Sequence, residues 1–208
     1  ASAILAGVLL KMGTYGLVRL PLQMMPETFA RFALPIALVG LVSILWGALV
    51  AFAQGNLKRR IAYTSVNHMG YTVLGIAVAG SALGSETARE LAMTGAVVEM
   101  VAHGLITGAL FLIAGAIWSR AQDYELDRFG GLAGVAPRLT AAAVLASFAS
   151  LGLPGLAGFV AELHVFLGAF AVYPWIAAIG LLGILVTAAL FLRLLRQAFF
   201  GALPEARA

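Results

Sequence analysis

Between Leu34 and Ala53 the chain reads LPIALVGLVSILWGALVAFA, a stretch without one charged side chain. A helix of about 20 apolar residues is long enough to cross the roughly 30 Å hydrocarbon core of a bilayer. Lipid offers the backbone no hydrogen bonds, and the stretch is too long and uninterrupted for a barrel strand. It therefore predicts a transmembrane helix.

The composition of the whole chain indicates the same class of protein. Of its 208 residues, 62% are hydrophobic and 11% are charged, whereas soluble domains have roughly 45–50% apolar and about 25% charged residues. So few charges cannot coat a water-facing surface, which argues against a soluble enzyme, a disordered chain and a secreted disulfide scaffold. The absence of cysteine excludes disulfides and Cys-ligated zinc or iron–sulfur sites. The 24 glycines fit a bundle of closely packed helices.

The same length criterion predicts further spans on both sides of the first. We predict an all-α integral membrane protein with six transmembrane helices that form a single transmembrane region over residues 1–208. The spans are about Ala1–Leu20, Leu34–Ala53, Ile61–Gly80, Leu91–Trp118, Thr140–Ala171 and Trp175–Phe200. The longest loop, Ser119–Arg138, has room only for a short surface helix. Because the chain starts at Ala1 inside an apolar run, without signal-peptide features, we expect it to begin partway through a larger protein.

The fifth predicted span is long and contains helix breakers. At 1.5 Å per residue it would measure about 48 Å. Its middle contains Gly152, Pro154 and Gly155. Proline removes a backbone donor, and glycine tolerates unusual dihedral angles. We therefore expect one span with a broken middle, a feature that often marks an ion pathway at membrane depth.

The basic residues predict the orientation of the spans. Three of them fall on one side and nine on the other, and the positive-inside rule places the larger set in the cytoplasm. The loop near Pro21–Pro35 then faces outward. The cationic loops do not suggest binding to nucleic acid. The smaller set is Arg19, Arg31 and Arg89, and the larger is Lys58, Arg59, Arg60, Arg120, Arg128, Arg138, Arg193, Arg196 and Arg207.

A few ionisable side chains lie deep inside the predicted spans. A charge at the bilayer centre costs from about 2.5 to over 10 kcal/mol, so such residues normally face a bundle interior or water and are functional by default. Lys11 lies near the middle of the first span, and Glu162 lies just past the break in the fifth. Both are candidates for proton transfer. The alternatives are that Lys11 extends to an interface and that Glu162 forms a static ion pair.

Histidines also lie inside the spans. His103 is central in the fourth span, and imidazole changes its charge near physiological pH. Glu99 lies four residues earlier on the same helix face, so we expect the two to pair. The alternative is a hydrogen-bonded packing histidine. His164 lies two residues after Glu162 and points in a different direction. The spacing of the histidines does not support a metal site.

The start of the third span carries a run of polar residues. Tyr63, Ser65 and His68 belong to a stretch whose polarity winds round the helix, which predicts the lining of a hydrated cavity near the cytoplasmic end. The alternative is polar packing between helices. Lys58 precedes this stretch, and it either anchors the span or passes protons from the cytoplasm into the cavity.

Several of these strings, in this order, resemble one family over nearly the whole chain. They are Gly7–Lys11, Tyr15–Arg19, Asn56–Gly70, Met100–Leu105, and Leu153–Gly155 followed by Phe159–Glu162. They are similar to the antiporter-like membrane subunits of proton-pumping NADH:quinone oxidoreductase (respiratory complex I), and within these to subunit M, the mitochondrial chain-4 type. That family has fourteen transmembrane helices, of which this chain resembles roughly the eighth to the thirteenth.

The resemblance implies a role for each matching residue. Lys11 matches the central-axis lysine of the eighth helix, and Glu162 matches the terminal carboxylate of the broken twelfth, where sister subunits usually carry lysine. His68 and His103 match histidines between them. The family's glutamate of the fifth helix and lysine of the seventh are not in this chain. Glu99 departs from the family, which would have an uncharged residue there.

The resemblance also implies a function. The chain would be a proton-translocating subunit of a multi-pass complex in the bacterial inner membrane, next to other antiporter-like subunits and lipid. It would hold no redox active site and no cofactor, and NADH, FMN, iron–sulfur clusters and quinone would bind in partner subunits. The alternatives are a subunit of a multisubunit cation/proton antiporter or membrane-bound hydrogenase, and a scaffold whose buried charges only fix helix packing.

Overall fold

A computed structural model describes residues 1–202, and their regular structure is helical apart from one isolated β-bridge between Asn56 and Glu125. The predicted all-α fold class is confirmed. The elements are α1 (Ser2–Ile4), η1 (Leu5–Leu9), α2 (Leu10–Leu17), η2 (Val18–Leu22), α3 (Pro26–Ala53), α4 (Leu57–Ala79), α5 (Glu86–Ala121), η3 (Leu126–Arg128), α6 (Leu132–Val135), α7 (Pro137–Ser150), α8 (Ala157–Val172) and α9 (Pro174–Ala198).

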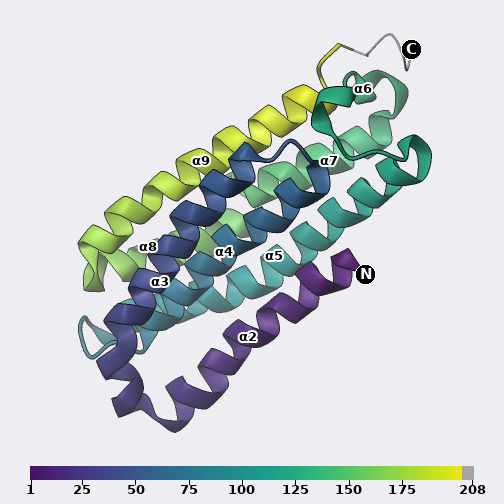
Figure 1. The fold of residues 1–208 in the computed structure, drawn as a ribbon. Coiled ribbons are helices and arrows are strands. Elements are labelled where there is room, and N and C mark those ends of the chain that lie inside the picture. The colour runs from purple at the N-terminus through teal and green to yellow at the C-terminus, as the bar shows by residue number, and fades with distance from the viewer. Residues whose placement is uncertain (203–208) are drawn as a thin grey trace.

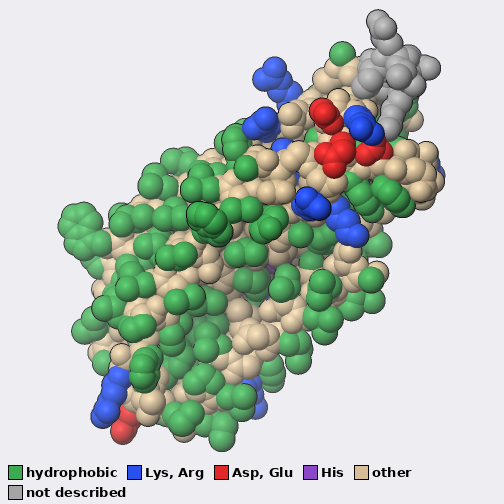
Figure 2. Space-filling view, viewed as in Figure 1, with side chains coloured by type: hydrophobic (Ala, Val, Ile, Leu, Met, Phe, Trp, Pro, Cys, Tyr) green, Lys and Arg blue, Asp and Glu red, His purple; other side chains and the backbone are tan. Residues whose placement is uncertain are grey.

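Long apolar helices run along an elongated bundle, with the N-terminal helix at its edge (Figure 1). Four helices of the described part are long and apolar enough to cross a membrane: the continuous Ser2–Leu22, and α3, α5 and α9. α8 is a shorter apolar helix. Figure 2 shows hydrophobic side chains over the length of the visible face, with charged ones gathered toward its two ends. This distribution is that of an integral membrane protein.

The first helix changes geometry at two places. π-helical turns occupy Leu5–Leu9 and Val18–Leu22, on either side of α2. The second turn contains Pro21, which cannot donate an α-helical hydrogen bond. Single π-turns inside helices often occur at functional sites, and α2 between them carries Lys11.

The loop predicted near Pro21–Pro35 is wrong, because helix fills almost all of it. Between η2 and α3 only Met25 is not helical, and α3 begins at Pro26 rather than at Leu34. Proline is suited to the first position of a helix, since its missing N–H has no partner there in any case. Pro35 is accommodated inside α3.

Two other helices begin before the apolar runs that predicted them. The Asn56 side chain accepts a hydrogen bond from the backbone N–H of Arg59, so α4 begins at Leu57. Ser85 accepts one from the N–H of Ala88 and thereby caps α5. Such caps satisfy donors that a helix start leaves unpaired. Capping rather than hydropathy therefore sets these two starts.

The predicted fifth span consists of two helices, α7 and α8, with residues 151–156 between them outside any helix. Gly152 and Gly155 have φ angles of +76° and +97° there. These angles lie in the left-handed region that glycine enters without steric cost. The interruption thus falls at the glycines and proline that the sequence singled out.

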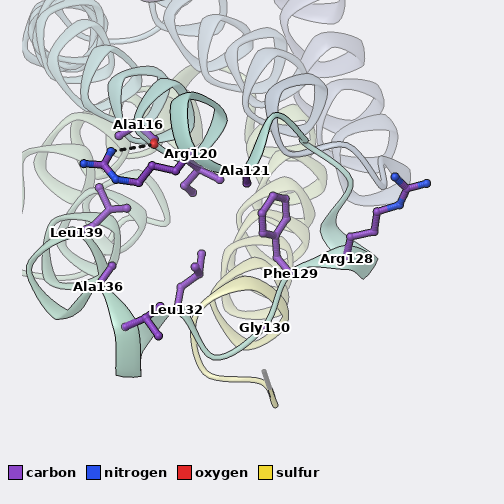
Figure 3. Close-up of a pocket in the computed structure, with 11 residues that line it drawn as sticks. Ala116, Arg120, Ala121, Arg128, Phe129, Gly130, Leu132, Ala136 and Leu139 are labelled. Atoms are coloured by element: carbon purple, nitrogen blue, oxygen red, sulfur yellow. Dashed lines mark hydrogen bonds between the residues drawn. The ribbon is translucent and has the colours of Figure 1, made fainter. Parts of the chain in front are cut away.

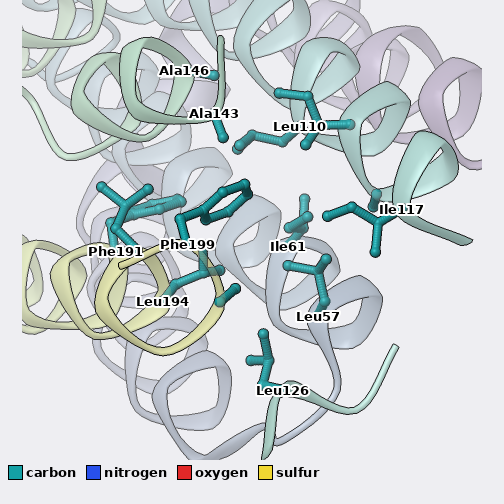
Figure 4. Packing of buried hydrophobic residues seen from close by; sticks show 14 of the residues in the cluster. Leu57, Ile61, Leu110, Ile117, Leu126, Ala143, Ala146, Phe191, Leu194 and Phe199 are labelled. Carbon is teal, nitrogen blue, oxygen red and sulfur yellow. The ribbon is translucent and has the colours of Figure 1, made fainter. Parts of the chain in front are cut away.

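Backbone hydrogen bonds tie several loops together at one end of the bundle. Leu57 N donates to the carbonyl of Tyr124 over 2.8 Å, and Ala133 N donates to that of Phe199 over 2.9 Å. Figure 4 shows the apolar cluster at this end, to which α4, α5, α7 and α9 contribute. The same end carries the larger basic set up to Arg196, while Arg207 lies outside the described residues.

Glycines bring α3 and α4 into backbone contact. A Cβ added to Gly47 would lie 2.5 Å from the backbone N of Asn67, and one on Gly70 would lie 2.7 Å from that of Ile44. Only glycine allows this approach. It fixes the position of α4, the helix that carries His68.

Gly47→Ala should therefore destabilise the protein. A methyl group there meets rigid backbone, and overpacking of this kind costs about 1–3 kcal/mol. Thermal unfolding of the detergent-solubilised protein measures the effect. Gly13→Ala is the control, since its Cβ would meet nothing within 4 Å. Equal unfolding temperatures for the two variants would contradict the packing.

Candidate functional site

Lys11 is buried in α2 against α5. Its Nζ donates to the carbonyl oxygen of Ala6 and lies 2.7 Å from Nδ1 of His103. Only 8% of the lysine is exposed. When Lys11 is an ammonium group it can only donate, so Nδ1 accepts and Nε2 carries the imidazole proton. Nε2 lies 2.9 Å from Oγ1 of Thr107, which can accept that proton's hydrogen bond.

A pair of glycines explains this contact. A Cβ on Gly104 would lie 2.8 Å from the carbonyl oxygen of Gly7, and one on Gly7 would lie 3.2 Å from that of Gly104. The two helices therefore touch through their backbones. Gly7 lies one turn before Lys11, and Gly104 follows His103, so the close approach brings the lysine to the imidazole.

His68 stands at the centre of the site. Its Nδ1 lies 3.1 Å from Oε1 of Glu99 and 3.9 Å from Oε1 of Glu162. Its Nε2 lies 3.1 Å from Oγ of Ser150. The ring centroids of His68 and His103 are 5.0 Å apart. These residues are at most 5% exposed.

The interruption between α7 and α8 forms one wall of the site. Ser150, the last residue of α7, supplies the hydroxyl that meets His68. A Cβ on Gly152 would lie 2.5 Å from Oε2 of Glu162. The broken segment thus leaves room for the carboxyl group by presenting a residue without a side chain.

The four residues expected to transfer protons therefore form one buried file, which we call the central file: Lys11, His103, His68 and Glu162. Its members come from α2, α5, α4 and α8 in that order. His164 lies outside it and is hydrogen-bonded through Nδ1 to the carbonyl of Val160. The structure brings together side chains far apart in sequence.

Glu99 is buried beside the file but bonds differently from expectation. The sequence predicted a pair with His103, whereas the hydrogen bond of Glu99 is to His68. The reason is that both ring nitrogens of His103 have other partners, Lys11 and Thr107. The i,i+4 rule that suggested Glu99 applies equally to Thr107, on the other side of His103, which the sequence analysis missed. Ser150 carried no sequence signal.

The residues expected to line or feed a hydrated cavity differ in burial, and only some of them line a cleft. Ser65 is buried, and its hydroxyl has no hydrogen-bond partner within the described residues. Lys58 is exposed, with Nζ 5.7 Å from the ring centroid of Tyr124. Both line a cleft of about 650 Å³ that also reaches Ala6, the residue whose carbonyl accepts from Lys11. Tyr63 is 40% exposed and does not line this cleft.

A second cleft, of about 520 Å³, lies at the basic end of the bundle (Figure 3). Its lining is mostly apolar, with Phe129 and Leu132 among the contributors. Arg120 lies at its edge, donating to the carbonyl of Ala116 over 3.3 Å. No member of the central file lines this cleft.

Comparison with known proteins gives a consistent set of relatives. The chain is 45% identical to NAD(P)H-quinone oxidoreductase chain 4 1 of Synechococcus sp. (strain JA-2-3B'a(2-13)), over 97% of this chain and 38% of that protein. It therefore spans well under half the length of such a relative. The predicted resemblance to the chain-4 type is confirmed.

Solved structures agree. A chain of respiratory complex I from Thermus thermophilus matches with a TM-score of 0.87 and 34% identity, over 95% of this chain and 40% of that one. A chain of the Mrp complex from Dietzia sp. DQ12-45-1b matches with a TM-score of 0.76 and 25% identity, over 84% of this chain and 31% of that one.

A family model covers most of the chain. The model described as "NADH:quinone oxidoreductase/Mrp antiporter, TM" matches residues 1–189. With the buried lysine, histidines and carboxylates assembled between apolar helices, the match leads to one conclusion: this chain belongs to the transmembrane family shared by NADH:quinone oxidoreductases and Mrp antiporters.

Proposed function

We propose that this chain forms part of a proton half-channel of an NADH:quinone oxidoreductase. Protons pass between Lys11 and Glu162 through His103, His68 and water. The observation that carries the proposal is the central file: a lysine hydrogen-bonded to one imidazole, a second imidazole 5.0 Å away, and a carboxyl group 3.9 Å beyond it. Buried ionisable groups at membrane depth typically form such relays.

The relay works by proton exchange between neighbours. Lys11 gives a proton to Nδ1 of His103, and the imidazole can release a proton from its other nitrogen. Water bridges the gap to His68, whose Nδ1 faces Glu162. Each charge in this buried file interacts strongly with the next, because the effective dielectric constant is lower there than in water. That interaction couples the groups.

The proposed topology has six spans. α4 is the third, although its polar face makes it less apolar than the four long spans, and α7 with α8 is the broken fifth. The basic end faces the cytoplasm of a bacterium, by the positive-inside rule, and the membrane is the inner membrane.

The rest of the machinery lies outside this chain. NADH, FMN, iron–sulfur clusters and quinone bind in partner subunits, and electron transfer occurs there. Neighbouring antiporter-like subunits are the membrane partners. Lys11 exchanges protons with a lysine on the part of the protein that precedes this chain in its longer relatives.

Secondary residues supply the file from the basic end. The cleft lined by Lys58 and Ser65 offers a water path from that end toward Ala6 and Lys11. Glu99 belongs to the same secondary group through His68. Tyr63 is exposed on the outer face of α4, and we assign it to the same secondary proton pathway.

The test is proton pumping by the whole complex in closed membrane vesicles. Acidification of the lumen is measured together with NADH oxidation in Lys11→Ala and Glu162→Gln. We expect both variants to lose pumping. Normal pumping in both would overturn the proposal, and normal pumping with reduced assembly would support a scaffold role instead.

A second candidate function is cation/proton antiport, and the match to the Mrp complex favours it. The higher identity to the quinone oxidoreductase chain favours the first. Sodium-dependent transport without quinone reduction would select the antiporter. A hydrogenase among the co-purifying subunits would select a membrane-bound hydrogenase.

A further inference from the structure

Only one of the two carboxyl oxygens of Glu99 has a hydrogen-bond partner within the described residues. The residue is 2% exposed, and its Oε1 lies 3.1 Å from Nδ1 of His68. Its Oε2 is buried and has no hydrogen-bond partner within residues 1–202. A buried polar atom without a partner is unusual in folded proteins and needs an explanation.

Glu162 competes for the same nitrogen. Its Oε1 lies 3.9 Å from Nδ1 of His68, compared with 3.1 Å for Oε1 of Glu99. A neutral imidazole carries one hydrogen in total, so when it is on Nδ1 that nitrogen donates well to only one carboxyl group at a time. Nε2 then accepts from the hydroxyl of Ser150. A neutral His68 with its proton on Nδ1 fits both contacts.

Near His68 the buried carboxyl groups outnumber the buried cations. Lys11 is the cation of the central file, and two carboxyl groups, Glu99 and Glu162, face it through the two histidines. Tyr71, whose ring centroid is 5.9 Å from that of His68, is the remaining titratable neighbour in the described residues. Buried charges persist when they are paired. Lys11 balances one carboxylate, which leaves the second in need of a proton.

We propose that Glu99 and Glu162 share a single proton, and that Nδ1 of His68 donates to whichever of the two is ionised. In the arrangement described, His68 bonds to Glu99, so Glu162 carries the proton. To exchange them, the proton of Glu162 passes through a water molecule to the unpartnered Oε2 of Glu99, and Nδ1–H of His68 then turns its hydrogen bond to Glu162. One O–H bond breaks at Glu162 and one forms at Glu99, the water gives and takes one proton, and His68 keeps its proton throughout. The proposal rests on the proton half-channel function.

The test is infrared spectroscopy of the whole complex, in which a neutral carboxyl group gives a carbonyl stretch distinct from that of a carboxylate. The variants are Glu99→Gln and Glu162→Gln. Each leaves one carboxylate to balance Lys11, so each should lose the same wild-type band. Glu90→Gln is the control, because Glu90 is an exposed residue of the same helix, and it should keep the band.

Three outcomes would overturn the shared proton: absence of the band in the wild type, its loss in only one of the two variants, or its retention in both. Glu99→Asp keeps a carboxyl group and should keep the band, which separates chemistry from misfolding. Pumping assays keep the two proposals apart. If Lys11→Ala and Glu162→Gln both pump normally while both Gln variants lose the band, the half-channel fails but the shared proton stands.

Discussion

Lys11→Ala should reduce proton pumping by about a hundredfold, a loss expected for a positioned proton donor. The variant removes the amine that lies 2.7 Å from Nδ1 of His103. It also removes the cation that balances one buried carboxylate. Alanine leaves space for water at this position, but water carries no fixed charge. The measurement is lumen acidification in closed vesicles, per NADH oxidised.

The control is Arg31→Ala, which removes an exposed cation from α3 near the opposite end from the large basic set. It should pump as the wild type does. Electron transfer from NADH to an artificial acceptor should be unchanged in both variants, because it takes place in other subunits. If Lys11→Ala assembles poorly but the assembled complex pumps at the wild-type rate, the lysine only fixes helix packing.

Hydropathy predicted the fold class but located helix ends poorly. Runs without charge identify membrane segments, because burial in lipid excludes charge along their whole length. Helix ends follow other rules. Asn56 and Ser85 cap α4 and α5 before the apolar runs begin, and Pro26 starts α3 inside a predicted loop. These signals are local and polar, and a search for apolar runs passes over them.

The candidate site was predictable as a set of residues and not as a set of contacts. Depth inside a span singled out Lys11 and Glu162, because ionisable groups are costly there. Their partners depend on how helices pack. The contact between Gly7 and Gly104 brings Lys11 to His103. A single sequence does not show that these two glycines, on different helices, lie opposite each other. For the same reason it does not show which residue pairs with Glu99.

Glu162→Gln should abolish pumping as completely as the loss of Lys11, for a different reason. Glutamine has nearly the same size and shape as glutamate, so the packing against Gly152 is preserved. What disappears is the ability to bind and release a proton at the end of the file. Glu162 Oε1 lies 3.9 Å from Nδ1 of His68, and this carboxyl group is the last member of the file that can exchange a proton.

Because the substitution is nearly isosteric, its result separates proton binding from packing. Glu27→Gln, at an exposed position in the first turn of α3, is the matched control and should pump normally. Glu162→Asp keeps the acid on a shorter arm and should restore part of the activity, since a water molecule can bridge the added gap to His68. Normal pumping by Glu162→Gln would mean that protons leave the file before they reach α8. The interruption at Gly152 would then serve packing alone.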